Sequence, residues 1–173
     1  MIKIIISCVL IVSVGGIGIL KARGLSERSK LLEEYIAFLQ LLITELNYSN
    51  FSAISIPEIL NKYSCNGKSK VGCLCKLVIE RIEDEEPLDL AFNNAFEKIY
   101  DKSILNNGDK ETMKSTGEYL GRFAIKGQEE LLIIQKEKLL AILSEAYNEE
   151  KIKGKMYKSL GFYIGTCLAI ILM

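Results

Sequence analysis

The stretch IIISCVLIVSVGGIGIL, residues 4–20, contains no charged side chain, and a second such stretch, LGFYIGTCLAIILM, occupies residues 160–173. Nearly all of the 22 basic and 22 acidic residues lie between them. As a helix, the first stretch would measure about 25 Å, against a hydrocarbon core of about 30 Å. We therefore predict membrane anchors at residues 1–23 and 159–173, with residues 24–158 held at one membrane face.

Each apolar stretch also has a second interpretation. Lys3 followed by an apolar run is typical of a signal peptide, but residues 20–23 lack the small-x-small pattern that a signal peptidase requires. Residues 160–173 are short enough to be a buried core helix. We favour two anchors, because lysines beside the second stretch can reach lipid head groups and residues 15–18 can pack closely against another helix.

Basic side chains flank both predicted anchors on the side that faces the middle of the chain. Lys21 and Arg23 follow the first anchor, and Lys155 and Lys158 precede the second. Positive charge beside a span prefers the cytoplasmic face. Both termini are therefore predicted outside, and residues 24–158 are predicted to form a cytoplasmic domain.

The middle segment has the apolar periodicity of helices. A period near 3.6 runs through residues 31–46 and again through 128–146, and no stretch alternates as a strand would. Shorter helices are expected at residues 57–63, 71–82, 87–99 and 110–123. The fold class is therefore all-α, a bundle of about six helices flanked by N- and C-terminal transmembrane helices.

Local signals suggest where the main helices begin and end. Ser26 is a plausible start for the first long helix. Asp109 follows the turn Asn106-Asn107-Gly108 and is placed to cap the helix from residue 110. Nothing stops the last long helix before Gly154, so it is able to continue into the second anchor.

The sequence offers little enzyme chemistry. It has no His, which is the commonest general base and metal ligand, and it contains no phosphate-binding loop or hydrolase motif. Cys65, Cys73 and Cys75 lack the spacing of a zinc site, and an enzyme that uses these thiols is only a minor alternative. With a net charge of +0, nothing calls for nucleic acid. We predict no catalytic residues, no cofactor and no small-molecule substrate.

An acidic run, formed by Glu83, Asp84, Glu85 and Glu86, is the most concentrated charge in the middle segment. Its plain interpretation is a solvated loop. Its functional interpretation is an exposed docking element for a basic partner, because complementary charge steers association.

Three further segments together resemble one protein family. These are Met156 to Phe162 with the apolar tail that follows, the element Gly117-Glu118-Tyr119-Leu120-Gly121 with Gln128 seven residues on, and Glu45-Leu46-Asn47-Tyr48 followed by Ile56-Pro57-Glu58-Ile59. Their order and the two anchors resemble the stage III sporulation protein AB family over essentially the whole chain. The chain departs from the family's pattern at Ala124, where members often carry an acidic residue, and around Pro57.

The resemblance implies a function in endospore formation. Members are membrane proteins of the mother cell, at the membrane around the forespore, and belong to a secretion-like channel. Their cytoplasmic domain is similar to the platform protein of type II secretion and type IV pilus machines, so it is expected to meet a cytoplasmic ATPase and other channel subunits. Glu45, Tyr48, Gly121 and Gln128 are then further candidate docking residues. The alternative is a membrane-tethered helical scaffold unrelated to secretion, self-associating through residues 131–146.

Overall fold

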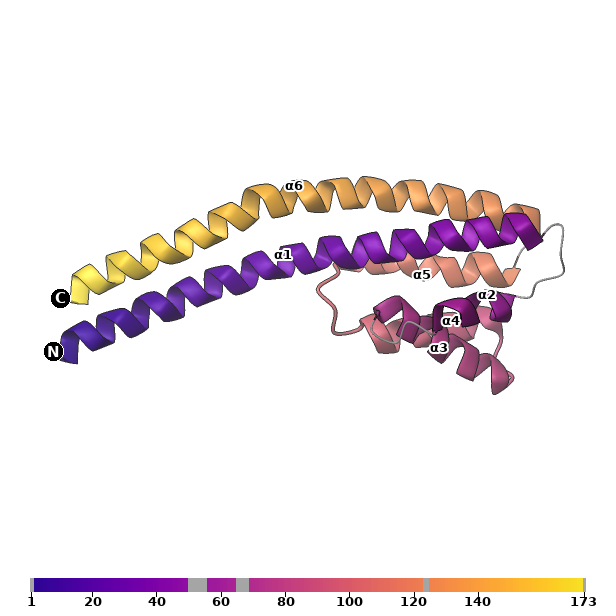
Figure 1. Cartoon of the computed structure of the whole chain (residues 1–173), viewed down its shortest axis with the longest axis horizontal. Coiled ribbons are helices and arrows are strands. Elements are labelled where there is room, and N and C mark those ends of the chain that lie inside the picture. Colours follow the sequence, from indigo (N-terminus) through magenta and orange to yellow (C-terminus); the bar gives the residue numbers. More distant parts are fainter. Residues whose placement is uncertain (1, 50–55, 65–68, 123–124, 173) are drawn as a thin grey trace. The chain divides into compact units, whose positions relative to one another are not determined.

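The described part of the chain is entirely helical (Figure 1). The computed structural model describes residues 2–49, 56–64, 69–122 and 125–172, and at several positions, among them 2–12, 48, 121 and 171–172, it describes the backbone alone. These ranges contain no strand, which confirms the all-α class and the predicted number of helices. The helices are α1 (Ile2–Ser49), α2 (Ile56–Ser64), α3 (Lys70–Glu83), α4 (Leu88–Tyr100), α5 (Asn107–Arg122) and α6 (Ile125–Leu172).

The first and last helices are far longer than the others, at 48 residues each. The predicted helix start at Ser26 is wrong, because α1 passes through this residue without a break. No proline lies near it, and a glycine inside a helix costs only about 1 kcal/mol, which is too little to end one. The expectation that the last helix continues through Gly154 is confirmed by α6.

The contacts within the chain group into two compact units. Unit 1 contains residues 1–30 and 144–173, and unit 2 contains residues 31–143. Helices α1 and α6 each contribute residues to both units. The predicted domain boundaries after residues 23 and 158 concern insertion into a membrane, and they stay predictions.

The two ends of the chain are helical, but their predicted role as transmembrane helices is not confirmed. Over the residues whose side chains are described, no helix has a stretch that is both long and apolar enough to cross a membrane. The side chains of residues 4–12, the most apolar part of the first predicted anchor, lie outside that description.

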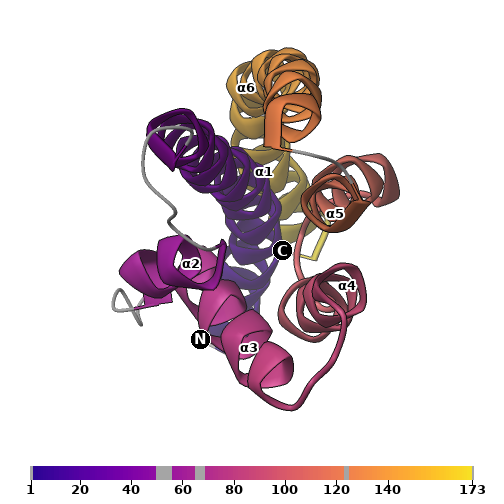
Figure 2. The same ribbon diagram turned by 90° about the vertical axis from the view of Figure 1, so that its right-hand side faces the viewer.

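The helices of unit 2 lie around one interior (Figure 2), and large side chains fill it. Tyr35 and Phe38 of α1 lie 5.7 Å apart between ring centroids, and Tyr35 meets Phe96 of α4 edge-on at 6.4 Å. Phe96 in turn stacks on Tyr100 at 4.6 Å. The apolar positions predicted to line the first long helix are all buried, as the period of 3.6 requires. They are Leu31, Leu32, Tyr35, Leu39, Leu42, Ile43 and Leu46.

Helices α3 and α5 begin at side-chain caps, whereas Pro87 before α4 makes no side-chain cap hydrogen bond. Helix α5 starts at Asn107 rather than at residue 110, because Asn106 is its capping residue. The Asn106 side chain accepts a hydrogen bond from the amide of Asp109 (2.7 Å), and the Asp109 carboxylate accepts one from the amide of Asn106 (3.1 Å). This reciprocal pair is a capping box, so the prediction that Asp109 itself caps the helix is wrong.

Candidate functional site

Helices α1 and α6 approach each other closely within unit 1, where small residues let the backbones touch. A Cβ added at Gly18 would clash with the carbonyl oxygen of Tyr157, and a Cβ added at Gly161 would lie 3.2 Å from the carbonyl oxygen of Val14 and 3.4 Å from the Cα of Gly15. The predicted close packing in residues 15–18 is therefore confirmed at Gly18, whereas a Cβ at Gly16 would meet nothing within 4 Å.

In unit 1, the usual distribution of large and small side chains between the interior and the surface is reversed. Its buried positions are mostly small, and many large apolar side chains are exposed. The buried small residues are Gly18, Ala22 and Ser29 on α1 and Ala146, Gly154, Gly161, Gly165 and Ala169 on α6. The exposed large ones are Ile17, Ile19, Leu20, Ile152, Met156, Leu160, Phe162, Tyr163, Ile164, Leu168 and Ile170. Transmembrane helix pairs show this order, because lipid is as apolar as the side chains it contacts.

A basic groove lies between α1 and α6 in the same unit. Its volume is about 540 Å³. Four basic side chains and one carboxylate line it, together with small and polar residues. The lining residues are Ala22, Arg23, Ser26, Tyr147, Glu150, Lys151, Gly154, Lys155 and Lys158. Three of the four residues predicted to flank the membrane, Arg23, Lys155 and Lys158, are thus brought together from the two helices.

The fourth predicted flanking residue, Lys21, lies elsewhere in unit 1. Its ammonium group sits 5.5 Å from the ring centroid of Tyr157 on α6, in a cation–π contact. Sequence reasoning did not select Lys151 as a site residue. The sequence does contain evidence for Lys151, because Lys151, Lys155 and Lys158 are spaced four and three residues apart and so share one helix face.

An ion-pair network ties the two helices further along unit 1. Arg28 of α1 donates to the Glu149 carboxylate of α6 at 2.8 Å, and Lys153 also pairs with Glu149. Arg28 is largely buried. The hydrogen bond from Lys153, with the charge of Arg28, lowers the pKa of Glu149 below its ordinary value of 4.5. The carboxylate therefore stays ionised, and its ion pair with Arg28 connects α1 with α6.

The acidic run forms an ordered turn after α3. Glu85 has φ 63°, a left-handed conformation that a non-glycine residue seldom adopts. The amide of Glu85 donates to Ile82 and that of Glu86 to Arg81, which is the Schellman arrangement at a helix end. Glu86 accepts from Arg81 at 2.8 Å and also contacts Asn94. Glu83, Asp84 and Glu85 remain exposed, so they alone of the run present free carboxylates.

The other predicted docking residues have different surroundings. Glu45 accepts a hydrogen bond from Lys62 of α2 at 2.8 Å, and Gln128 is buried, with its Nε2 donating to the carbonyl oxygen of Leu120 at 2.9 Å. Both side chains hold helices together within unit 2. The side chain of Tyr48 and the surroundings of Gly121 lie outside what the structure describes.

A buried polar network in unit 2 was missed by sequence reasoning. The Tyr35 hydroxyl donates to the carbonyl oxygen of Met113 (2.8 Å) and lies 2.7 Å from Oγ1 of Thr116. Gln135 of α6 donates to the same Thr116 oxygen at 2.7 Å. Burial raises the pKa of Tyr35 well above its ordinary value of 10.0. A Gln among the apolar positions of the last long helix was the only signal, and it did not identify its partners.

Gly117 explains part of the glycine element that the sequence singled out. A Cβ there would lie 2.8 Å from Cδ1 and 2.9 Å from Cβ of Phe92 on α4. These distances are shorter than van der Waals contact. Gly117 is therefore the residue that allows α5 to pack closely against α4.

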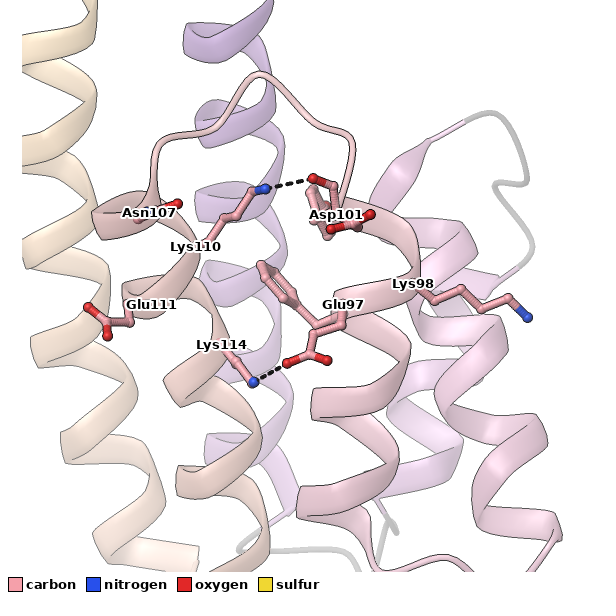
Figure 3. A pocket seen from close by; sticks show the side chains of 9 residues that line it. Glu97, Lys98, Asp101, Asn107, Lys110, Glu111 and Lys114 are labelled. Carbon is pink, nitrogen blue, oxygen red and sulfur yellow. Dashed lines mark hydrogen bonds and ion pairs between the residues drawn. The ribbon is translucent and has the colours of Figure 1, made fainter.

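A second hollow opens between α4 and α5 (Figure 3). Its volume is about 760 Å³, and it is lined by charges of both signs. Lys110 donates to the carbonyl oxygen of Asp101 at 2.8 Å, and Lys114 pairs with Glu97. Because these lysines are engaged by neighbouring acceptors, the hollow has no concentrated charge of one sign for a ligand.

Of the described thiols of unit 2, Cys73 is exposed and Cys75 is buried. Burial raises the pKa of the Cys75 thiol to about 12, so it stays protonated and weakly nucleophilic. Cys65 lies outside the described residues. Among the described residues, no three His, Cys, Asp or Glu side chains are grouped so that they could hold a metal ion.

Comparison with known proteins gives a consistent set of similarities. The family described as stage III sporulation protein AB matches residues 3–173. Stage III sporulation protein AB of Bacillus subtilis (strain 168) is 24% identical over 173 residues, covering 100% of both chains. A solved structure of stage III sporulation protein AB (SpoIIIAB) has a TM-score of 0.65 and 19% identity, covering 73% of this chain and 98% of the other, which shows a shared fold.

Proposed function

The chain belongs to the stage III sporulation protein AB family, and on that premise we propose that it acts in endospore formation as a non-enzymatic membrane subunit of a secretion-like channel between mother cell and forespore. In this proposal unit 1 is anchored in the mother-cell membrane around the forespore. Unit 2 is a cytoplasmic platform that couples an ATPase to the membrane subunits of the channel.

The observation that carries the membrane attachment is the reversed packing of unit 1. Burying a large aliphatic or aromatic side chain on folding in water is worth roughly 1.5–3 kcal/mol, yet unit 1 buries glycine and alanine and leaves such side chains outside. A surface rich in exposed large apolar side chains is typical of one that is covered by lipid or by another protein. Glycine contacts between helices with apolar exteriors favour lipid.

The orientation follows from the basic residues of unit 1. Arg23 and Lys158 lie at the inner ends of the two apolar stretches, and positive residues beside a span are retained in the cytoplasm. We therefore propose that both termini lie outside and that residues 24–158 face the cytoplasm.

Reporter fusions to the full chain test this topology. Alkaline phosphatase, which is active only outside the cytoplasm, is fused to either terminus, and a fluorescent protein that matures only inside is inserted between Lys102 and Ser103 in the turn after α4 as the matched control. We expect phosphatase activity at both ends and fluorescence from the insertion. A terminal fusion without phosphatase activity, in a protein whose fluorescent insertion is bright, would overturn the two-anchor arrangement.

The platform role draws support from the family and from the shape of the acidic turn. Glu83, Asp84 and Glu85 form an exposed acidic turn on unit 2. Complementary charge of this kind accelerates and orients association with a basic surface. We propose this turn as a docking element for the ATPase.

Charge reversal tests the docking element. Changing Glu83, Asp84 and Glu85 to Lys in the full-length protein should reduce capture of the co-expressed sporulation ATPase. The matched control changes three exposed carboxylates elsewhere on unit 2, Glu118, Glu130 and Glu137, to Lys and should retain it. Equal capture by both variants would exclude the turn as the docking element. Absence of capture by the unmodified protein would instead count against the platform role and favour a scaffold unrelated to secretion.

A further inference from the structure

We propose that the basic groove of unit 1 binds the phosphate-bearing head group of an anionic phospholipid, whose acyl chains lie along the apolar exterior of the same unit. This inference rests on the proposed membrane attachment and adds a specific ligand to it. In this proposal the groove binds one class of lipid, and this binding is additional to the general attachment of unit 1 to the membrane.

The charges in the groove are not neutralised by the ion pairs of unit 1. Glu149 is already shared by Arg28 and Lys153, neither of which lines the groove. Arg23, Lys151, Lys155 and Lys158 line it, and Glu150 is the one carboxylate among the lining residues. In the described part of the chain these four cations have no ion-pair partner. An excess of positive charge from two helices therefore converges on one hollow, which suits an anion that accepts several charge-assisted hydrogen bonds.

The groove also has room for a head group. Gly154 lines it, and a Cβ added there would meet no heavy atom within 4 Å. Ala22 and Ser26 are the other small lining residues, and Ser26 supplies a hydroxyl that can bond to a phosphate or glycerol oxygen. The guanidinium of Arg23 can hold two phosphate oxygens at once, while the lysines act as mobile point charges.

The residues that adjoin the groove along both helices decide in favour of lipid over free phosphate. Ile19 lies four residues before Arg23 on α1, and Phe162 lies four residues after Lys158 on α6, so each shares a helix face with a basic residue of the groove. Both side chains are exposed. A ligand with an anionic head and an apolar tail matches this order of charge followed by apolar surface on both helices. Inorganic phosphate would use only the basic half.

The test uses the purified full-length protein in neutral detergent. Phosphatidylglycerol or phosphatidylcholine is added, and bound lipid is counted by native mass spectrometry while the melting temperature is followed by circular dichroism. We expect phosphatidylglycerol to be retained and to raise the melting temperature, and phosphatidylcholine to do neither. Equal retention of both lipids would overturn the inference, and so would an equal shift with inorganic phosphate or with glycerophosphoglycerol.

Two variants locate the site. Changing Arg23, Lys151, Lys155 and Lys158 to Gln should weaken apparent phosphatidylglycerol binding about 600-fold, since each basic residue near an anionic surface contributes roughly a factor of five. Gly154→Leu should also block binding by filling the groove without removing a charge. The control changes four exposed lysines outside the groove, Lys30, Lys98, Lys102 and Lys138, to Gln and should bind normally. Unchanged binding by both groove variants would overturn the assignment.

Carbonate extraction of membranes separates this inference from the proposed attachment. A wild-type protein that stays in the membrane pellet but shows no preference for phosphatidylglycerol would refute the groove assignment alone. A wild-type protein released into the supernatant would refute the membrane attachment, and the lipid inference with it.

Discussion

Units 1 and 2 are built from the same two long helices, yet they solve the packing problem in opposite ways. In unit 2, α1 buries Tyr35, Phe38 and Leu39, and charged residues occupy its other faces. In unit 1, the same helix buries Gly18 and Ala22 and leaves its large apolar residues exposed. Helix formation and burial are therefore separate properties. The same helix buries large side chains in unit 2 and small ones where it contacts α6 in unit 1.

The two units also differ in how they satisfy polar groups. Unit 2 keeps a neutral, buried network of hydroxyl and amide groups around Thr116. Unit 1 uses the charged, partly exposed network around Glu149. Four mutational comparisons test this contrast, each in the full-length protein in detergent with unfolding followed by circular dichroism.

The largest expected effect comes from truncating an aromatic ring in each unit. Phe96 is 2% exposed and Phe162 is 59% exposed. Phe96→Ala should lower the free energy of unfolding by about 3–5 kcal/mol, because it removes buried surface and leaves a cavity. Phe162→Ala should change it by less than about 0.5 kcal/mol. Similar losses for both would show that unit 1 buries its large side chains after all.

The second comparison adds a methyl group at the close contacts. Gly117→Ala and Gly18→Ala should each cost about 1–3 kcal/mol, since the new Cβ meets Phe92 in one case and the backbone of Tyr157 in the other. Gly16→Ala is the control, because its Cβ would meet nothing within 4 Å. It should stabilise the helix by up to about 1 kcal/mol. Destabilisation by Gly16→Ala equal to that by Gly18→Ala would contradict the assigned crossing point.

The third comparison concerns the buried network of unit 2. Tyr35→Phe removes the hydroxyl that bonds to Met113 and Thr116 and should cost about 1–2 kcal/mol. Because burial raises the pKa of Tyr35 well above 10.0, this cost should be the same from about pH 6 to pH 9. A cost that varied with pH in this range would show that a charged group takes part in the network.

The smallest effect is expected at Glu149 in unit 1. Its pKa is lowered from 4.5 in the folded protein, so its contribution is present above that pH and is lost as the pH falls below it. The pair is partly exposed, so the advantage of the wild-type protein over Glu149→Gln should be no more than about 1 kcal/mol at neutral pH. It should decline as the pH falls below 4.5 and through the lowered pKa of Glu149. Loss of the advantage at alkaline pH instead would contradict the sign of the shift.

Local periodicity was enough to predict the helices but not their limits. The buried positions from Leu31 to Leu46 followed from the period of 3.6, because the rule relates neighbours on one helix. The cap of α5 was placed at Asp109 instead of Asn106, because both residues can accept the relevant hydrogen bond and only the backbone geometry distinguishes them. Ser26 failed as a helix start for a related reason: a capping residue type does not end the helix that precedes it.

The sequence was enough to select charged residues for the candidate site, but it did not show which of these residues lie next to one another. Arg23, Lys155 and Lys158 could be selected because they adjoin apolar stretches, but the groove that joins them depends on how α1 and α6 cross. Gln128 was selected as an interaction residue, and its contact with Leu120 is visible only once α5 and α6 are packed. The partners of Gln135 were hidden for the same reason.

The sequence by itself determined the all-helical class, the apolar ends, the basic residues beside them and the absence of His, because these are properties of composition and of order along the chain. Only the tertiary structure decided that Gly18 meets Gly161, that residues more than a hundred positions apart form one basic groove, and that the large apolar side chains of unit 1 are exposed. The physical reason is that a helix presents every face to its surroundings. The periodicity of the sequence shows which side chains lie on each face of a helix, but only packing against a second helix decides which face is covered.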